Sequence, residues 1–473
     1  MRTVRLVVAF LAAVATGTPG LHAQQPSQAA VDAIFAAYDQ REGPGCALAV
    51  VRDGKIEYQR GYGYANLDYG IRNSPDMVYY VGSVSKQFTA AAVALLAQEG
   101  RISLDADVRD YFPELPDYGR TMTIRHLVHH TSGLRDIYTL MMLAGIRLED
   151  VFTDEAALSL IARQRELNFL PGDDYLYSNS GYWLLGQLVE RVTGQSLRAY
   201  ADERIFRPLG MHDTHFHDEP QHVFRNRVIS YGGNAGDGYR ITYLQNFDKV
   251  GAGGLYTTLG DLAKWDANFY EASVGGAAFL ETMHRRGVLT TGDTLSYAFG
   301  LGIGQRRGLD VVRHAGALMG FRADMARYPE ERFTVITLCN HGAIDASALA
   351  DRVADLYLGH RLQPVEAGTA VARAPAPATA TPDGPPEAGR LAGVDGVYRS
   401  PELEADWRLT VRDGALLVTL RATPDRVARP AGADAYDLGG QVVLRLERDA
   451  AGTVTGFTVD AGRVRNIRFE RQP

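Results

Sequence analysis

The chain has 473 residues, a formal net charge of −7 and 46% hydrophobic residues. This length allows two or three domains, and the apolar content is that of an ordinary globular protein. The acidic balance argues against a nucleic-acid partner, since such proteins are usually basic.

The N-terminus has the pattern of a secretory signal peptide. Arg2 and Arg5 form a basic region, residues 6–15 form an unbroken apolar run, and a cleavage site ends at Ala23. The apolar run is too short to serve as a membrane anchor. We therefore expect a signal peptide over residues 1–23, a periplasmic or secreted mature chain and no stable membrane anchor.

The first elements predicted after this region are a helix and a hairpin. Apolar residues at helical spacing predict a helix over residues 31–38. Residues 46–52 and 55–62 then flank Asp53-Gly54, a two-residue pair typical of tight hairpin turns. The sequence thus predicts two antiparallel strands near the start of the mature chain.

A Ser-x-x-Lys motif, Ser83 and Lys86, follows where a helix over residues 88–98 is expected to begin. Positions i and i+3 share a helix face, so the lysine amine can reach the serine hydroxyl. Serine is a weak nucleophile without a base, and lysine acts as one only where its surroundings lower its pKa. The alternative is a capping serine followed by an exposed lysine, and the motif alone is only suggestive.

The middle of the chain combines helices, polar loops and β-like runs. Residues 123–134 predict a helix that runs into a turn, and the polar loop 171–182 precedes an amphipathic helix. Tyr177 and Asn179 lie in that loop, where a turn role is the ordinary interpretation. Further on, residues 262–269 predict a helix. Three β-like runs follow, at residues 311–316, 321–328 and 333–339.

Neither the histidines nor the cysteines have metal-site spacing. Four histidines occur in one short segment, but without the H-E-x-x-H pattern of a helical zinc site, so a histidine-rich loop is the favoured interpretation. The cysteines, Cys46 and Cys339, form no C-x-x-C pair. No metal or other cofactor is expected. The four histidines are His212, His215, His217 and His222.

The last part of the chain has a different composition. Residues 363–390 are rich in proline and alanine, which is typical of a linker. Short β-like runs separated by turn signals then predict a small all-β domain over residues 391–473, a barrel or a sandwich. This domain shows no cluster of nucleophile and base, so we expect an accessory role. The runs are residues 407–411, 416–420, 442–446, 453–459 and 464–469.

With three motifs in order, the chain resembles the penicillin-recognising serine hydrolases, on the branch of class C β-lactamases, D,D-carboxypeptidases, D-aminopeptidases and related esterases. The motifs are Ser83-x-x-Lys86, Tyr177-Ser178-Asn179 and His314-Ala315-Gly316. The resemblance covers roughly residues 30–358 and implies a hydrolase domain over residues 24–362. The implied fold class is α/β (α+β), an antiparallel sheet flanked by helices plus an all-helical lobe. The C-terminal domain is similar to lipocalin-like barrels.

The resemblance also implies roles for the motif residues. Ser83 would form a covalent acyl-enzyme, and Lys86 and Tyr177 would share acid–base duty, because a phenol beside an ammonium can ionise near neutral pH. Asn179 would hold Lys86 and the substrate amide. The backbone N–H groups of Ser83 and Ala317 would form the oxyanion hole.

The third motif departs from the K-T-G of the family, where lysine and threonine help bind a substrate carboxylate. Here Ala315 has no hydroxyl and His314 is mostly neutral near pH 7. Gly316 keeps the glycine of the motif. This disfavours an efficient β-lactamase or D,D-carboxypeptidase, although Arg322 could restore some carboxylate affinity.

The departure favours a small molecule or short peptide as substrate, namely a D-amino-acid peptide, an amide or a small ester. A β-lactamase or D,D-carboxypeptidase is the alternative within the same class. A non-catalytic receptor for peptide or peptidoglycan fragments is the alternative from another class. Retention of Lys86 beside Ser83 argues against such a receptor.

The resemblance further implies that the strand beginning at Cys46 and the strand ending at Cys339 are antiparallel neighbours. The two cysteines should then lie close together. An exported protein meets an oxidising compartment, which permits a disulfide. A register offset of two residues would keep the cysteines apart, and buried free cysteines are common, so the bond itself stays open.

Overall fold

The computed structural model describes residues 26–39, 42–242, 246–364, 390–421 and 424–473. The signal peptide expected over residues 1–23 lies outside the described residues. So does most of the expected linker, residues 365–389.

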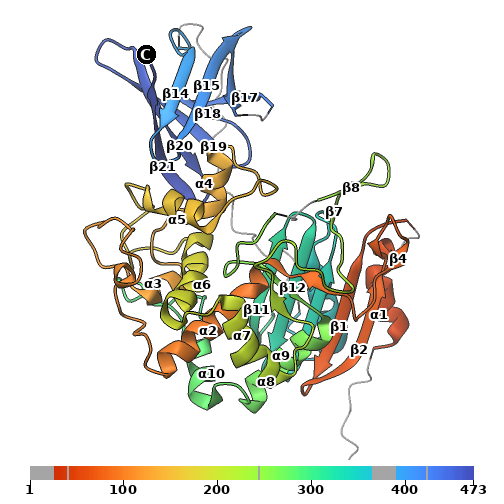
Figure 1. Cartoon of the computed structure of the whole chain (residues 1–473). Helices are drawn as coiled ribbons and strands as arrows, with labels where there is room; N and C mark the ends of the chain where they lie inside the picture. Colours follow the sequence, from red (N-terminus) through yellow and green to blue (C-terminus); the bar gives the residue numbers. More distant parts are fainter. Residues whose placement is uncertain (1–25, 40–41, 243–245, 365–389, 422–423) are drawn as a thin grey trace, which may run out of the picture.

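The centre of the molecule is a six-stranded antiparallel sheet with the strand order β10-β11-β12-β13-β1-β2 (Figure 1). The first strands pair with the last because β1 lies between its hairpin partner β2 and the late strand β13. The predicted hairpin and the three predicted late strands are confirmed. The strands are β1 (Cys46–Arg52), β2 (Lys55–Tyr62), β10 (Gly302–Arg306), β11 (Leu309–Leu318), β12 (Phe321–Tyr328) and β13 (Phe333–Cys339).

Helices cover both faces of this sheet, which explains why β1 and β13 are apolar without alternation. On one face, α1 (Gln28–Phe35) and α11 (Ala346–Leu358) share a buried apolar cluster with the strands. On the other face lies α9 (Leu259–Glu271), and its buried Trp265 donates a hydrogen bond to Gln87. The central strands of the sheet are therefore buried, whereas its edge strands β2 and β10 are partly exposed.

Beside the sheet lies an all-helical lobe built around α2 (Lys86–Gln98), which is buried from Lys86 to Leu96. Small alanines along α2 let its neighbours approach closely. The other helices are α3 (Ile124–Val128), α4 (Ile137–Leu143), α5 (Asp154–Ala162), α6 (Asn179–Thr193), α7 (Leu197–Ala201), α8 (Arg207–Leu209) and α10 (Gly276–His284), with a π-helix at Asp202–Phe206 and 3-10 turns at Ala36–Tyr38, Gly82–Ser85 and Val108–Asp110. The expected α/β (α+β) class is confirmed.

Further short strands lie outside the main sheet and the barrel. They form one three-stranded sheet and two hairpin-like pairs. The three-stranded sheet has the order β5 (Tyr79–Tyr80), β9 (Leu255–Thr257), β6 (His215–Phe216), and the pairs are β3 (Tyr64–Asn66) with β4 (Ile71–Arg72) and β7 (Tyr231–Asn234) with β8 (Gly238–Ile241).

Cys46 and Cys339 are directly opposed in the β1–β13 ladder and form a disulfide, with their Cα atoms 4.0 Å apart. Their expected proximity is confirmed, and no register offset separates them. The bond, which the sequence leaves open, ties the start of the sheet to its last strand.

Loss of this disulfide should lower the stability of the protein. It closes a loop with a sequence separation of 293 residues, and the chain-entropy model assigns such a loop up to about 5 kcal/mol. We expect urea unfolding of a Cys46→Ser/Cys339→Ser double variant to show a lower midpoint than the oxidised protein. Two freely alkylated thiols in the denatured wild type would contradict the bond.

The C-terminal region is a closed eight-stranded barrel, one of the two forms that its sequence predicts. Trp407, Phe457 and Phe469 stack inside it. Three of its strands, β14, β17 and β18, were not predicted from the sequence. Two arginines and a proline in β17 obscure the strand pattern there. The strands are β14 (Gly396–Ser400), β15 (Ala405–Arg412), β16 (Ala415–Leu420), β17 (Arg426–Gly432), β18 (Ala435–Asp437), β19 (Val442–Arg448), β20 (Val454–Ala461) and β21 (Val464–Arg471).

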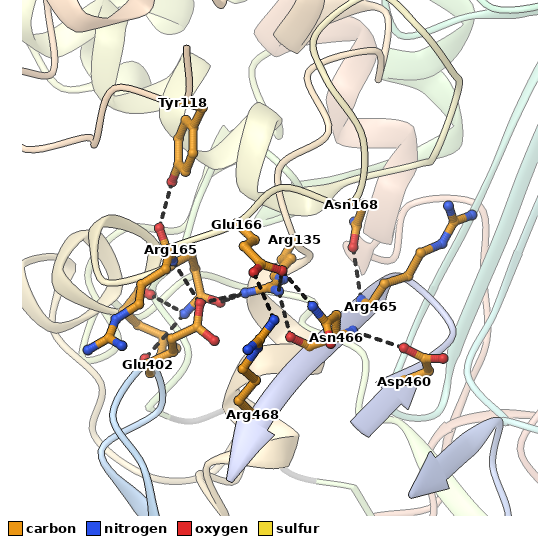
Figure 2. A network of polar contacts seen from close by, with 12 residues as sticks. Tyr118, Arg135, Arg165, Glu166, Asn168, Glu402, Asp460, Arg465, Asn466 and Arg468 are labelled. Atoms are coloured by element: carbon orange, nitrogen blue, oxygen red, sulfur yellow. Dashed lines mark hydrogen bonds and ion pairs between the residues drawn. The ribbon is translucent and has the colours of Figure 1, made fainter. Parts of the chain in front are cut away.

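The barrel docks on the helical lobe above α4 and α5 (Figure 1). Figure 2 shows the polar centre of this interface, where the fully buried Arg135 pairs with the nearly buried Glu402 at 2.7 Å. Arg135 also donates to the backbone carbonyl of Asn466 in β21 at 2.9 Å. A buried ion pair is costly to break from one side, so it holds the barrel in one position on the lobe.

Candidate active site

A cavity of about 900 Å³ opens between the helical lobe, the sheet and the barrel. Six of the seven residues predicted for the site line it, and the seventh, Lys86, is buried directly behind Ser83. The sheet, the lobe and the loops between them thus bring the three sequence motifs together. The six lining residues are Ser83, Tyr177, Asn179, His314, Gly316 and Ala317.

Ser83 sits in the 3-10 turn Gly82–Ser85, and α2 begins at Lys86. The tight turn keeps the two side chains on one face, and the Lys86 Nζ lies 3.2 Å from the Ser83 Oγ. Ser85 points elsewhere, since its hydroxyl donates to the Gly82 carbonyl and accepts from the Leu255 N–H. The contact expected from the Ser-x-x-Lys spacing is therefore formed.

Two glycines let the turn approach strand β11. Gly82 has a φ of +54°, and a Cβ there would lie 2.7 Å from the Ala317 nitrogen. A Cβ on Gly316 would lie 2.0 Å from the Val81 carbonyl oxygen and 3.0 Å from the Ser83 nitrogen. Only glycine fits both positions. The close approach places the backbone N–H groups of Ser83 and Ala317 next to each other at the cavity.

Lys86 is fully buried and contacts two further acceptors. Its amine donates to the Asn179 Oδ1 at 2.8 Å and to the Ala252 carbonyl at 2.6 Å. Burial lowers the pKa of Lys86 well below its ordinary value, although the negative charge of Asp136 opposes this. A neutral amine has two N–H groups for these acceptors, which leaves its lone pair for Ser83.

Asp136 is a residue that the sequence analysis missed. Its Oδ2 accepts from both the backbone nitrogen and the side-chain amide of Asn179, each at 2.7 Å. Its Oδ1 caps α4 by accepting from the Tyr138 and Thr139 N–H groups. Asp136 thereby fixes the Asn179 amide with its oxygen toward Lys86. A capping aspartate before an apolar helix was the only sequence signal.

Tyr177 lies over the amine of Lys86, with 4.8 Å from the Nζ to the ring centroid, and packs against His130 at 4.1 Å. The Tyr177 hydroxyl is buried near the Ser83 hydroxyl and makes no hydrogen bond of good geometry within the described residues. Burial raises the pKa of Tyr177, and the Ser83 hydroxyl and Arg463 oppose this rise without cancelling it. The raised pKa argues against the expectation that Tyr177 ionises near neutral pH and favours a protonated phenol.

The Tyr177→Phe substitution is expected to lower the turnover rate by about 10² to 10⁴, the range of a general acid or base. It removes a buried hydroxyl with no hydrogen bond, so the melting temperature should hardly change. Steady-state kinetics and a thermal melt test this, with Tyr175→Phe as the matched control outside the cavity lining. Near-normal turnover in Tyr177→Phe would show that the phenol is not needed.

The third motif contributes backbone rather than charge. The His314 ring is buried, with its Nε2 3.0 Å from the Tyr297 hydroxyl and its Nδ1 2.7 Å from the Ala315 carbonyl oxygen. Burial lowers the pKa of His314 to about 4, so the ring is neutral at pH 7, as expected. Arg322 also lines the cavity, but one of its guanidinium nitrogens is held by two backbone carbonyls.

The barrel contributes one residue to the cavity, Arg463 at the β20–β21 turn. Its guanidinium lies 4.7 Å from the centroid of the Tyr177 ring and 4.0 Å from the Asp136 Oδ2. An accessory domain was expected from the sequence, which gave no sign of these contacts to Tyr177 and Asp136, 286 and 327 positions away in the chain. The barrel forms part of the wall of the site.

The histidine-rich segment lies away from this cavity. His215, His217 and His222 pack with the rings of Phe224 and Tyr256. Within the described residues, no group of three or more His, Cys, Asp or Glu side chains could hold a metal ion. Over the same part of the chain, no helix is long and apolar enough to cross a membrane.

An antiparallel sheet beside a helical lobe, with Ser83, Lys86 and Tyr177 at their junction, defines a class of serine hydrolases. The comparisons with known proteins agree, since the family model described as Beta-lactamase matches residues 31–359. The chain therefore belongs to the beta-lactamase family, within the penicillin-recognising serine hydrolases.

Two relatives in this family are D-aminopeptidases. The one from Gluconobacter oxydans is 32% identical over 314 residues, which cover 66% of this chain and 58% of the relative. The one from Cereibacter sphaeroides (strain ATCC 17023) is 30% identical over 444 residues, covering 86% of this chain and 81% of the relative. The chain thus spans less than two thirds of the Gluconobacter protein.

Solved structures share the fold at lower identity. The octameric penicillin-binding protein homologue from Pyrococcus abyssi has a TM-score of 0.63 and 22% identity, covering 93% of this chain and 98% of that one. The D-amino acid amidase from Ochrobactrum anthropi SV3 in complex with L-phenylalanine has a TM-score of 0.60 and 22% identity. The match covers 70% of this chain and 99% of the amidase chain. The likeness to the Pyrococcus protein extends beyond the hydrolase domain.

Proposed function

We propose that this protein hydrolyses D-amino-acid peptides, amides or small esters through an acyl-enzyme at Ser83. The observation that carries the proposal is the buried Lys86 amine, 3.2 Å from the Ser83 hydroxyl and with its pKa lowered by burial. The D-aminopeptidase relatives and the D-amino acid amidase fold support D-amino-acid substrates.

In the first half of the reaction, neutral Lys86 takes the proton of the Ser83 hydroxyl while the oxygen attacks the substrate carbonyl carbon. The carbonyl oxygen becomes an oxyanion, which the N–H groups of Ser83 and Ala317 stabilise. The protonated Tyr177 then donates its proton to the leaving amine or alcohol, and the carbon–heteroatom bond breaks. Lys86 then passes to Tyr177 the proton that it took from Ser83.

In the second half, water attacks the acyl-enzyme at the same carbon. A water proton passes to the Lys86–Tyr177 pair, the oxyanion forms again, and the Ser83 oxygen leaves and regains a proton. Asn179 keeps the Lys86 amine directed at Ser83 throughout, because Asp136 holds the Asn179 amide in one orientation.

The proposal is tested with D-alanine p-nitroanilide, its L-enantiomer and p-nitrophenyl acetate. We expect turnover of the D-anilide or the ester by the wild type, preference for D over L, and no turnover by Ser83→Ala. Absence of turnover on all three substrates, together with measurable binding, would favour the non-catalytic receptor. Preference for the L-anilide would refute the proposed substrate class.

Turnover of the β-lactam nitrocefin is expected to be poor compared with that of p-nitrophenyl esters. The reason is the third motif, in which Ala315 offers no hydroxyl and His314 no charge. Restoring the hydroxyl in Ala315→Thr should raise nitrocefin acylation by about tenfold, the value of one added hydrogen bond. Ala343→Thr, elsewhere on the cavity wall, is the control. Strong nitrocefin hydrolysis by the wild type would favour a β-lactamase instead.

We also propose that the protein is exported to the periplasm or secreted. The basic and apolar N-terminal pattern and the Cys46–Cys339 disulfide support an oxidising compartment. N-terminal sequencing of protein from a periplasmic fraction should begin at Gln24. Recovery from the cytoplasm with an intact N-terminus would refute this.

A further inference from the structure

Arg463 is a cationic residue at the active-site cavity that the mechanism does not use. It lies in the two-residue turn between β20 and β21, where Gly462 has a φ of +54° and Ala461 pairs with Val464. Its side chain is 45% exposed and lines the same cavity as Ser83. A guanidinium there meets any substrate that reaches the serine.

The backbone that carries Arg463 is held in place by the helical lobe. The side chain of Asn168 donates to the Arg463 carbonyl at 3.0 Å and accepts from the Arg465 N–H at 2.9 Å. Further along β21, the side-chain amide of Asn466 donates a hydrogen bond to the carboxylate of Glu166 at 2.6 Å (Figure 2). Together with the buried Arg135–Glu402 pair, these contacts fix the position of the turn at the cavity.

The guanidinium of Arg463 has few polar partners. Within the described residues it contacts the Tyr177 ring at 4.7 Å, and its one ion pair is with Asp136 at 4.0 Å. Asp136 is only 2% exposed, and both of its oxygens already accept backbone or Asn179 hydrogen bonds. The N–H groups of Arg463 are thus available for another acceptor, and an arginine fork suits a carboxylate.

We propose that Arg463 binds a carboxylate of the substrate, so that the barrel supplies a specificity determinant to the active site. The third motif, where the family usually binds this group, offers the neutral His314 and no hydroxyl. The acidic residues of the cavity are Asp136, whose oxygens are occupied, and Asp345, which caps α11 through the Ala348 N–H. A substrate ammonium near Arg463 would meet repulsion rather than an open carboxylate.

The inference rests on the proposed function and is tested with two substrate pairs that differ in one negative charge. N-succinyl- and N-acetyl-D-alanine p-nitroanilide vary the charge on the acyl side. N-acetyl-D-alanyl-D-alanine and its C-terminal amide vary it on the leaving side. Wild-type kcat/KM should favour the charged member of at least one pair, and this preference should shrink as salt rises.

In Arg463→Gln, kcat/KM for that charged substrate should fall by about tenfold, the value of a charge-assisted contact at a half-exposed site. Compared on the plateau of each protein's pH profile, kcat/KM for the neutral partner should change by less than threefold, on the order of normal surface substitutions. Arg463→Lys should keep part of the preference. Arg465→Gln, in the adjoining strand β21 but outside the cavity lining, should keep all of the preference.

Equal losses on the charged and neutral members of both pairs, or no loss on either, would overturn the inference. If the wild type cleaves none of the four compounds, the proposed function fails for them, and binding decides the inference alone. Calorimetric titration of the same compounds into Ser83→Ala, with and without Arg463→Gln, then measures the preference directly. Equal affinity for charged and neutral members would overturn the role of Arg463.

Discussion

Ser83→Ala is expected to lower turnover of the preferred substrate by about 10⁴ to 10⁶, the loss seen when one member of a nucleophile–base unit is removed. The oxygen that it deletes is the one contacted by the Lys86 amine. The fold should persist, since Ser83 is only partly buried. Comparison of single-turnover rates, with a thermal melt for each protein, measures the effect.

Covalent labelling locates the nucleophile independently of rates. A fluorophosphonate should add one label to the peptide that contains both Ser83 and Ser85, and fragmentation should place it on Ser83. Ser85 is the internal decoy, because its hydroxyl is buried and hydrogen-bonded to Gly82 and Leu255. A label on Ser85, or turnover that persists in Ser83→Ala, would refute the mechanism.

Lys86→Arg is expected to lower turnover by about 10² to 10⁴, the contribution of a general base. Arginine keeps the positive charge and the hydrogen-bond donors but does not lose its proton in proteins. The comparison with Lys86→Met separates the two roles: both variants should be equally slow if the lysine acts as a base. High activity in Lys86→Arg would show that the lysine serves as a fixed charge.

The dependence of the wild-type rate on pH should show the titration of Lys86. The base acts in its neutral form, so the rate should rise with pH as Lys86 loses its proton and then level off. Because burial lowers the pKa of Lys86, the midpoint of this rise in rate should lie well below the pKa of about 10.4 of a free lysine. The positive charge of Arg463 also lowers the pKa of Lys86. In Arg463→Gln the midpoint of the rise in rate should therefore move to higher pH.

The parts of the site that could be predicted from sequence depend on local geometry. Ser83 and Lys86 are one helical turn apart, and Asp53-Gly54 marks its hairpin through the turn alone, with φ values of 50° and 73°. Tyr177 and Asn179 follow no such rule. They look like turn residues in isolation, and only their order among three motifs indicated a site.

The residues that were missed owe their position to tertiary packing. Asp136 looks like an ordinary helix cap, and its bonds to Asn179 join positions 43 apart in the chain. Gly462-Arg463 looks like an ordinary hairpin turn, and no periodicity shows that the turn meets another domain. The neutral state of Tyr177 was missed for a similar reason, because burial by neighbours such as His130 raises its pKa more than Ser83 and Arg463 lower it.

The place of Arg463 also bears on how such an enzyme can diverge. A two-residue hairpin tip tolerates many side chains at its second position, and Arg463 packs into neither the barrel interior nor the apolar core. The charge at the cavity can therefore change by a single substitution that leaves the Ser83 and Lys86 side chains and the buried Arg135–Glu402 contact in place, while it shifts the pKa of Lys86. If Arg463 sets the substrate preference as proposed, an exchange of barrels between homologues should redirect substrate choice while Ser83 and Lys86 stay in place.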